Sequence, residues 1–136
     1  MQRLKTRAQF QAVLAGTIIA KTPHFALHRN RLDAGSPVLQ TDKLAEPAKL
    51  FCQQDMWIGA MVPKRWAKRA VTRNAIKRQI YTVSAEFSQL YPQAAFLVRL
   101  RSGFARTEFV SAVSEQLRQA VRNEIQTLMQ AGANSA

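Results

Sequence analysis

The sequence predicts a single domain that mixes helices and strands, of α/β or α+β class, whose elements follow the order α, β, β, β, α, β, α. The chain has 136 residues, a length typical of one compact domain. Hydrophobic residues make up 47% of it, enough for a core that needs neither disulfides nor metals. Its apolar residues alternate between helical spacing and short strand-like runs. We place the domain at residues 1–130 and expect residues 131–136 to form a disordered tail.

The first half of the chain predicts one helix and two strands before a long loop. Residues 4–15 have helical spacing of apolar residues, with Thr6 as N-cap and Gly16 as the stop. Extended segments follow at 17–20 and 24–30, separated by a proline. Residues 31–55 hold half of all the acidic residues and two prolines, so we expect a long surface loop there.

The second half predicts two strands and two helices. The apolar run 56–62 is typical of a buried strand, and a helix is expected over 67–89, with a further strand at 96–101. The final helix is expected to begin at Thr107. The apolar positions of the two helices recur every three or four residues, which is the spacing of a helix face packed on a sheet: Ile76, Ile80, Val83 and Phe87, then Val110, Val113, Leu117, Val121, Ile125 and Leu128.

The net charge points to a polyanionic partner. Lysine and arginine number 20 against 8 acidic residues, a formal charge of +12. Setting aside the acidic loop 31–55 leaves 17 cations and 4 acids, so the charge of the remainder is +13. Such an excess repels itself in a compact fold and favours binding to nucleic acid.

Several other classes of protein are disfavoured. The single cysteine, Cys52, forms neither an internal disulfide nor a multi-cysteine metal site, which indicates a reducing, cytoplasmic compartment. No run approaches the length of a membrane span. The polar residues after Met1 do not have the pattern of a signal peptide. We therefore expect a soluble protein of the cytoplasm.

The densest positive charge lies between residues 64 and 78. Seven of these fifteen residues are cations, and no acid occurs between Met56 and Ala85. On a helix, Arg73, Asn74, Lys77 and Arg78 share one flank beside the apolar stripe. A solvated face normally interleaves charges of both signs, so this acid-free flank favours nucleic acid, duplex or single-stranded.

The segment from Val62 to Arg78 resembles the signature of the bacterial ribonuclease P protein component. It contains a strand that ends in two basic residues, then a helix with an Arg-Asn pair and a basic pair three residues later. The resemblance extends to Leu4, Phe10, Gly59, Arg101 and the closing helix. It implies an α/β sandwich similar to a ribosomal-protein domain, with a left-handed βαβ crossover around the central helix.

The resemblance also implies a function. The family is the RNA-binding protein partner of a catalytic RNA that removes the 5′ leader from precursor tRNA, so the chain would be a subunit of an endoribonuclease without being catalytic alone. It implies a monomer in a 1:1 complex with the catalytic RNA, binding to precursor tRNA, and no membrane or DNA partner. The protein would bind no cofactor by itself, and Mg²⁺ would be held in the RNA–protein assembly.

The resemblance assigns two groups of site residues. A cleft formed by the first helix and the sheet would hold the single-stranded leader through Phe10, Leu14 and His28, with the His28 ring able to stack on a base. The expected RNA-binding residues are Lys64, Arg65, Lys68, Arg69, Arg73, Asn74, Lys77, Arg78 and Arg101.

Other readings of the sequence are weaker. His24 and His28 have no acid or cysteine close in sequence, so we expect ordinary strand residues and no metal site, and Cys52 has no basic partner that would make it a catalytic thiol. No catalytic residue is predicted. Trp57 is expected in the core, and Trp66 is either a stacking platform or a lid on the helix end. The alternative function is a non-enzymatic ribosomal or chaperone-like RNA-binding protein.

Overall fold

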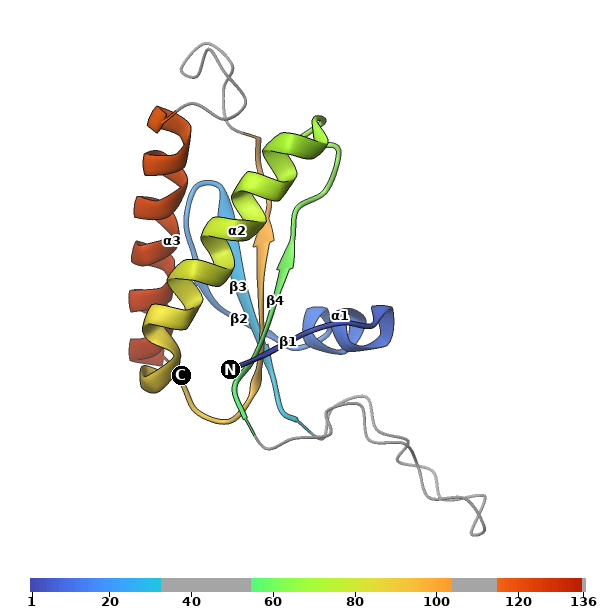
Figure 1. Ribbon diagram of the computed structural model, residues 1–136. Coiled ribbons are helices and arrows are strands. Elements are labelled where there is room, and N and C mark those ends of the chain that lie inside the picture. Colours follow the sequence, from blue (N-terminus) through green and yellow to red (C-terminus); the bar gives the residue numbers. More distant parts are fainter. Residues whose placement is uncertain (33–54, 104–114, 136) are drawn as a thin grey trace, which may run out of the picture.

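The computed structural model describes residues 1–32, 55–103 and 115–135. These residues form a five-stranded mixed sheet in the strand order β1-β4-β5-β3-β2. Helices α2 and α3 lie side by side on one face of the sheet, and α1 stands apart from them (Figure 1). The predicted α+β sandwich is confirmed. None of the helices in the described ranges is long and apolar enough to cross a membrane.

The N-terminal segment contains a short strand that the sequence pattern did not predict. Strand β1 (Gln2–Arg3) pairs in parallel with β4, and helix α1 (Arg7–Leu14) follows it. The predicted N-cap is confirmed, because the Thr6 hydroxyl accepts from the Gln9 amide while the Gln9 side chain accepts from the Thr6 amide. This capping box fixes where the chain turns from the sheet into α1.

The two predicted extended segments form an antiparallel pair. Strand β2 (Thr17–Lys21) pairs with β3 (Phe25–Asn30), and β3 pairs on its other side with β5 (Ala95–Leu100). A bulge between Ile18 and Ala20 shifts the register of β2. Most of the predicted loop 31–55 lies outside the described residues.

A βαβ unit forms the other half of the sheet. Strand β4 (Trp57–Met61) leads into helix α2 (Ala70–Phe87), a 3₁₀ turn η1 (Ser88–Leu90) follows, and the chain returns along β5, parallel to β4. In Figure 1 both strands point upward, α2 crosses in front of the sheet, and β5 lies to the left of β4. This is the left-handed crossover that the resemblance implies, against the right-handed rule that most such units obey.

The last helix differs from its prediction at its C-terminal end. Helix α3 spans Glu115–Ser135, so the expected disordered tail is wrong for residues 131–135, which continue the helix. Gly132 is buried in this last part of α3. The predicted start at Thr107, with Val110 and Val113, lies outside the described residues.

The side chains of the sheet alternate between two cores. The larger core lies under α2 and α3 and contains Phe25, Phe96 and Ile80. The smaller core lies under α1 and contains Leu4, Val13, Trp57, Ala95 and Leu97. We call this second side the α1 face of the sheet. The inner strands β3, β4 and β5 are therefore largely buried on both faces, which explains their nearly continuous apolar runs, whereas the residues of β2 are exposed or half-buried.

Gly132 allows α3 to approach the sheet closely. A Cβ atom at this position would overlap the Leu27 side chain and the Tyr91 hydroxyl, whose own hydrogen bond to the Met129 carbonyl measures 2.5 Å. We expect Gly132→Ala to lower the free energy of unfolding by about 1–3 kcal/mol, because the overlap outweighs the gain of up to ~1 kcal/mol in helix propensity. Denaturant unfolding measures this change. Asn134→Ala, an exposed site in the same turn, is the control and should be neutral or slightly stabilising.

Candidate nucleic-acid interface

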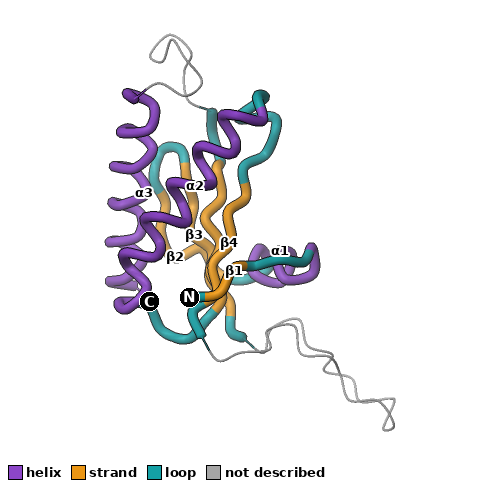
Figure 2. The backbone as a smooth tube through the Cα atoms, in the orientation of Figure 1, coloured by secondary structure: helices purple, strands orange, loops and turns teal. Residues whose placement is uncertain are grey.

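The basic residues gather at one edge of the sheet. Strands β4 and β5 are parallel, so the segments that follow them, 62–69 and 101–103, leave the sheet at the same edge, which we call the carboxyl edge (Figure 2). The two segments touch, because a Cβ on Gly103 would lie 2.9 Å from the Trp66 carbonyl oxygen. Helix α2 begins at the same edge. The fold therefore brings Arg101 to the cluster that begins at Lys64.

The turn before α2 is held by one arginine. The Arg73 guanidinium donates through Nη1 to the carbonyl oxygens of Ala67 and Lys68, at 3.0 and 2.8 Å. Ala67 is buried in the larger core, so its side chain anchors this turn to the core. Arg73 thus has a structural task besides its charge: it holds the segment that presents Lys64, Arg65, Lys68 and Arg69.

The predicted flank of α2 is confirmed in its geometry. Ile76 and Ile80 are buried against the sheet, whereas Asn74 and Arg78 are exposed and Lys77 is half-buried. The first turn of α2 contains no acid. The positive end of the helix dipole and the cations therefore act in the same direction, toward an anion.

None of these cations is neutralised by the described part of the chain. Within residues 1–32, 55–103 and 115–135 the ion pairs lie elsewhere, and no acid pairs with a cation of the 64–78 segment. Arg65 packs over the Trp66 ring, with its Cζ 5.4 Å from the ring centre. Trp66 is 38% exposed, so part of its surface is open to a base as well as packed by Arg65.

Arg101 is partly engaged within the protein. Its Nε donates to the Thr22 carbonyl at 2.9 Å and its amide to the His24 carbonyl at 2.8 Å, which ties β5 to the turn between β2 and β3. The side chain is nevertheless exposed at the carboxyl edge. Arg101 therefore extends the cationic surface and also stabilises that edge.

The first helix and the sheet form a second, more apolar surface. Phe10 and Leu14 are half-buried and pack against the smaller core. A Cβ on Gly59 would come within 2.6 Å of a Leu4 methyl and 2.9 Å of the Phe10 ring, so this glycine is what lets α1 approach β4. The Phe10 ring therefore has a fixed position on the α1 face.

The prediction that His28 stacks on a base is wrong. His28 is only 5% exposed, so its ring has no open face. Its Nε2 instead accepts a hydrogen bond from Nε of Arg99 at 3.1 Å. Burial lowers the pKa of His28, and the nearby charges of Arg99 and Lys21 lower it further. The ring is therefore held in its neutral form.

This neutral histidine makes stability depend on pH. In the unfolded chain the pKa of His28 is about 6.5, and folding lowers it. As the pH falls below about 6.5, His28 binds a proton in the unfolded chain, whereas in the folded chain it does so only at a lower pH. We expect the free energy of unfolding to fall by up to ~1.4 kcal/mol per pH unit in this window. His28→Gln, compared with wild type by denaturant unfolding at pH 7.5 and 5.5, should lack this component.

The other histidine has a structural role. His24 Nδ1 lies 2.7 Å from Oε1 of Glu124, and Oε2 of the same carboxylate accepts from the Thr22 hydroxyl and the His24 amide. Glu124 comes from α3, a hundred residues further along the chain, which is why the sequence did not reveal this acid. The contact clamps the β2–β3 turn to α3.

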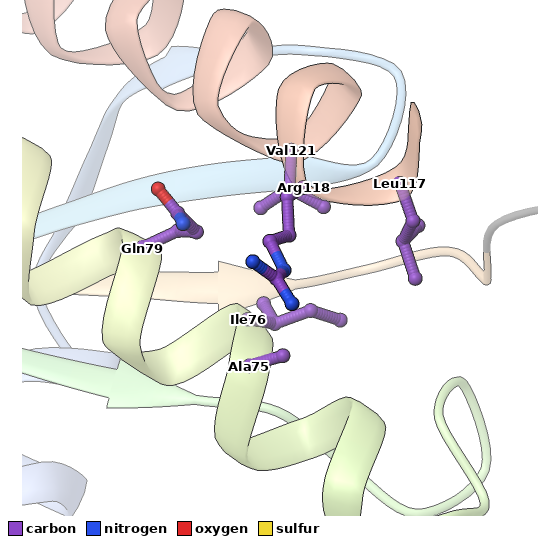
Figure 3. A pocket seen from close by; sticks show the side chains of 6 residues that line it. All are labelled: Ala75, Ile76, Gln79, Leu117, Arg118 and Val121. Carbon is purple, nitrogen blue, oxygen red and sulfur yellow. The ribbon is translucent and has the colours of Figure 1, made fainter. Parts of the chain in front are cut away.

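Beside these surfaces the described ranges contain a narrow gap between two helices and no cluster of metal ligands. A narrow gap between α2 and α3, which Arg118 spans, has room for about one water molecule (Figure 3). It is lined by Ala75, Ile76, Gln79, Leu117, Arg118 and Val121. Residues 1–32, 55–103 and 115–135 bring no three His, Cys, Asp or Glu side chains together for a metal ion.

The fold and the site define a basic α+β domain with an unpaired cationic edge and a left-handed crossover. The family model described as Ribonuclease P matches residues 1–130, and the chain belongs to this family. The ribonuclease P protein components of Trichormus variabilis and of a Nostoc species are each 33% identical to it over 102 residues. Each match covers 68% of this chain and 66% of the relative, just under two thirds of its length.

Solved structures of the family share the fold. The Staphylococcus aureus RNase P protein superposes with a TM-score of 0.62 at 17% identity, covering 96% of this chain and 94% of that one. The Thermotoga maritima RNase P protein gives a TM-score of 0.56 at 15% identity, covering 93% and 97%. At these identities the likeness extends to the arrangement of helices and strands.

Proposed function

We propose that this protein is the RNA-binding subunit of ribonuclease P and assists a catalytic RNA in removing the 5′ leader from precursor tRNA. The observation that carries the proposal is the carboxyl edge. At that edge, this member of the ribonuclease P family has several lysine and arginine side chains that form no ion pair with an acid in the described part of the chain. Such an array suits the phosphate groups of a folded RNA, because arginine grips phosphate through two bonds and lysine adds a point charge.

The carboxyl edge and the α1 face bind different RNAs. The carboxyl edge and the exposed flank of α2 bind the catalytic RNA through Lys64, Arg65, Lys68, Arg69, Asn74, Lys77, Arg78 and Arg101. The α1 face binds the single-stranded leader, with Phe10 stacking on a base and Leu14 adding apolar contact. Stacking and backbone charge tolerate any sequence, which suits leaders that differ from one tRNA to the next.

The RNA, and not this chain, performs catalysis. The protein contributes binding and orientation, and the Mg²⁺ ions of the assembly are held by RNA. The complex contains one protein and one catalytic RNA, and it works in the cytoplasm.

Reconstitution tests the proposal. The purified chain is mixed with the catalytic RNA and a precursor tRNA of the same organism at low Mg²⁺, and leader removal is measured on a gel. We expect faster cleavage than with the RNA alone, and none with the chain alone. A chain that binds RNA and co-sediments with ribosomal subunits, yet leaves cleavage unchanged, would favour the ribosomal or chaperone-like alternative.

A further inference from the structure

Two cations lie in one row on the α1 face, beside the part that α1 covers. The strand registers place Lys21, Ala26, Arg99 and Met61 directly opposite one another across β2, β3, β5 and β4. Directly opposite residues of neighbouring strands point to the same face of a sheet. Lys21 is exposed, and Arg99 and Met61 are half-buried. The row therefore forms a cationic surface on a side of the sheet that is otherwise apolar.

The next row explains how Arg99 is held. It contains His28, Leu97 and Gly59, and Gly59 lies under the first helix against Phe10. The Arg99 Nε–H group points at the Nε2 lone pair of His28, at 3.1 Å. Because this nitrogen accepts, the neutral ring carries its proton on Nδ1, which is buried and has no partner among the described residues. Among the described residues, one ring nitrogen of His28 therefore has no hydrogen-bond partner, while the other holds Arg99.

The other N–H groups of Arg99 and those of Lys21 have no acceptor in the described part of the chain. A guanidinium has five N–H groups, and His28 accepts from only one of those on Arg99. Neither the Nη atoms of Arg99 nor the Lys21 ammonium has a partner in the described ranges. Two strand spacings, roughly 10 Å, separate the backbones of Arg99 and Lys21. Two long side chains at this separation reach a common anion between them.

We propose that Arg99 and Lys21 bind a phosphodiester group of the single-stranded leader, and that His28 is a positioning residue that fixes the plane of the Arg99 guanidinium. This inference rests on the proposed function and names a contact within it. A base stacked on Phe10 has its phosphate near this row, since Gly59 borders the Phe10 ring and lies two residues before Met61, the partner of Arg99. Arg99 lies two residues before Arg101 in the sequence, so the row lies next to the carboxyl edge.

The test uses the protein assembled with its catalytic RNA, so that the flank of α2 is already occupied. Affinities for precursor tRNA and for mature tRNA are measured over a range of salt concentrations. Arg99→Met and Lys21→Met keep the apolar stems and remove the charges. Each should weaken binding of precursor tRNA about 10-fold and reduce the salt slope of that binding by ~0.7, with mature tRNA unaffected. Arg118→Met, an exposed arginine on α3, is the charge-matched control and should change neither.

The role of His28 is tested by a pair of variants. His28→Phe removes the acceptor without burying a new polar group, and we expect the same loss of salt slope as in Arg99→Met. His28→Gln offers a carbonyl oxygen in place of Nε2 and should restore the slope. A purely structural role would lower the melting temperature of His28→Phe and leave its salt slope at the wild-type value, which would overturn the positioning role.

The outcomes separate this inference from the proposed function. If the wild-type assembly distinguishes precursor from mature tRNA but Arg99→Met does so equally well with an unchanged slope, the phosphate site is wrong and the leader surface stands. If the wild-type assembly does not distinguish the two tRNAs, the leader role in the proposed function is overturned.

Discussion

Lys77→Ala combined with Arg78→Ala is expected to weaken binding to the catalytic RNA by about 100-fold at physiological salt. The two residues lie on the outward flank of α2, and no described acid pairs with either. A charge-assisted hydrogen bond contributes ~1.5 kcal/mol or more, so two of them amount to about 3 kcal/mol. Every 1.4 kcal/mol corresponds to a factor of ten in the dissociation constant. Filter binding or fluorescence anisotropy measures the change.

The salt dependence of this binding shows whether the lost contacts were to phosphate. Removal of two phosphate contacts should reduce the slope of log affinity against log salt by about 1.4–1.8. The control is Arg118→Ala with Arg122→Ala, which removes the same formal charge from the neighbouring helix. Arg122 already pairs with Glu86 at 2.8 Å and Arg118 with Glu115 at 3.7 Å, so this control should change affinity only slightly. Equal affinity of the wild type and the α2 double variant would remove this flank from the interface.

Arg73 is left intact in that experiment because the structure gives it a second task. Its guanidinium bonds to the carbonyl oxygens of Ala67 and Lys68, so an alanine there would also loosen the turn that carries four other cations. The sequence placed Arg73 and Lys77 on the same flank, and helical geometry alone gives no reason to treat them differently. Only the three-dimensional path of residues 64–69 separates a positioning arginine from one that is open to RNA.

The elements with strong local signals were predictable from the sequence. Thr6 caps α1 as expected, and the Ile76/Ile80 stripe of α2 is buried as expected, because both depend on neighbours within one or two helical turns. Strand β1 was not predictable, since two residues carry no periodicity and pairing with β4 is its only cause. The helical end of α3 was missed because chain termini commonly fray, whereas here Gly132 packs closely on Leu27.

The α1 face was predictable only in part. Phe10 was assigned to it through the family resemblance, and the structure places that ring against Gly59. The ring of His28 was expected to be open to a base. Whether a strand residue is buried depends on what packs against the strand, and the residues of the strand alone do not show this. Arg99 was not singled out, although it is a charge between the buried residues Val98 and Leu100. A charged residue inside an otherwise apolar strand is a signal for a partner across the sheet, and here that partner is His28.

Phe10→Ala is expected to reduce the preference of the assembled complex for precursor tRNA over mature tRNA by about 10- to 100-fold. Stacking of a base on an aromatic side chain contributes about 1–3 kcal/mol, which corresponds to that range. Affinity for the catalytic RNA should stay at the wild-type value, because Phe10 lies on the α1 face and α2 binds from the other side of the sheet. Competition between leader-bearing and mature tRNA for the assembled complex measures the preference.

A matched control separates stacking from packing. Phe87→Ala removes a second half-buried phenylalanine, which packs against the larger core at the end of α2, far from α1 in the fold. Both variants lose core contacts and should lose stability, whereas only Phe10→Ala should lose the preference for the leader. Phe10→Tyr keeps an aromatic face and should retain most of it. If Phe10→Ala discriminates as well as wild type while its stability falls, the ring serves the core between α1 and the sheet, and the leader must bind elsewhere on the protein.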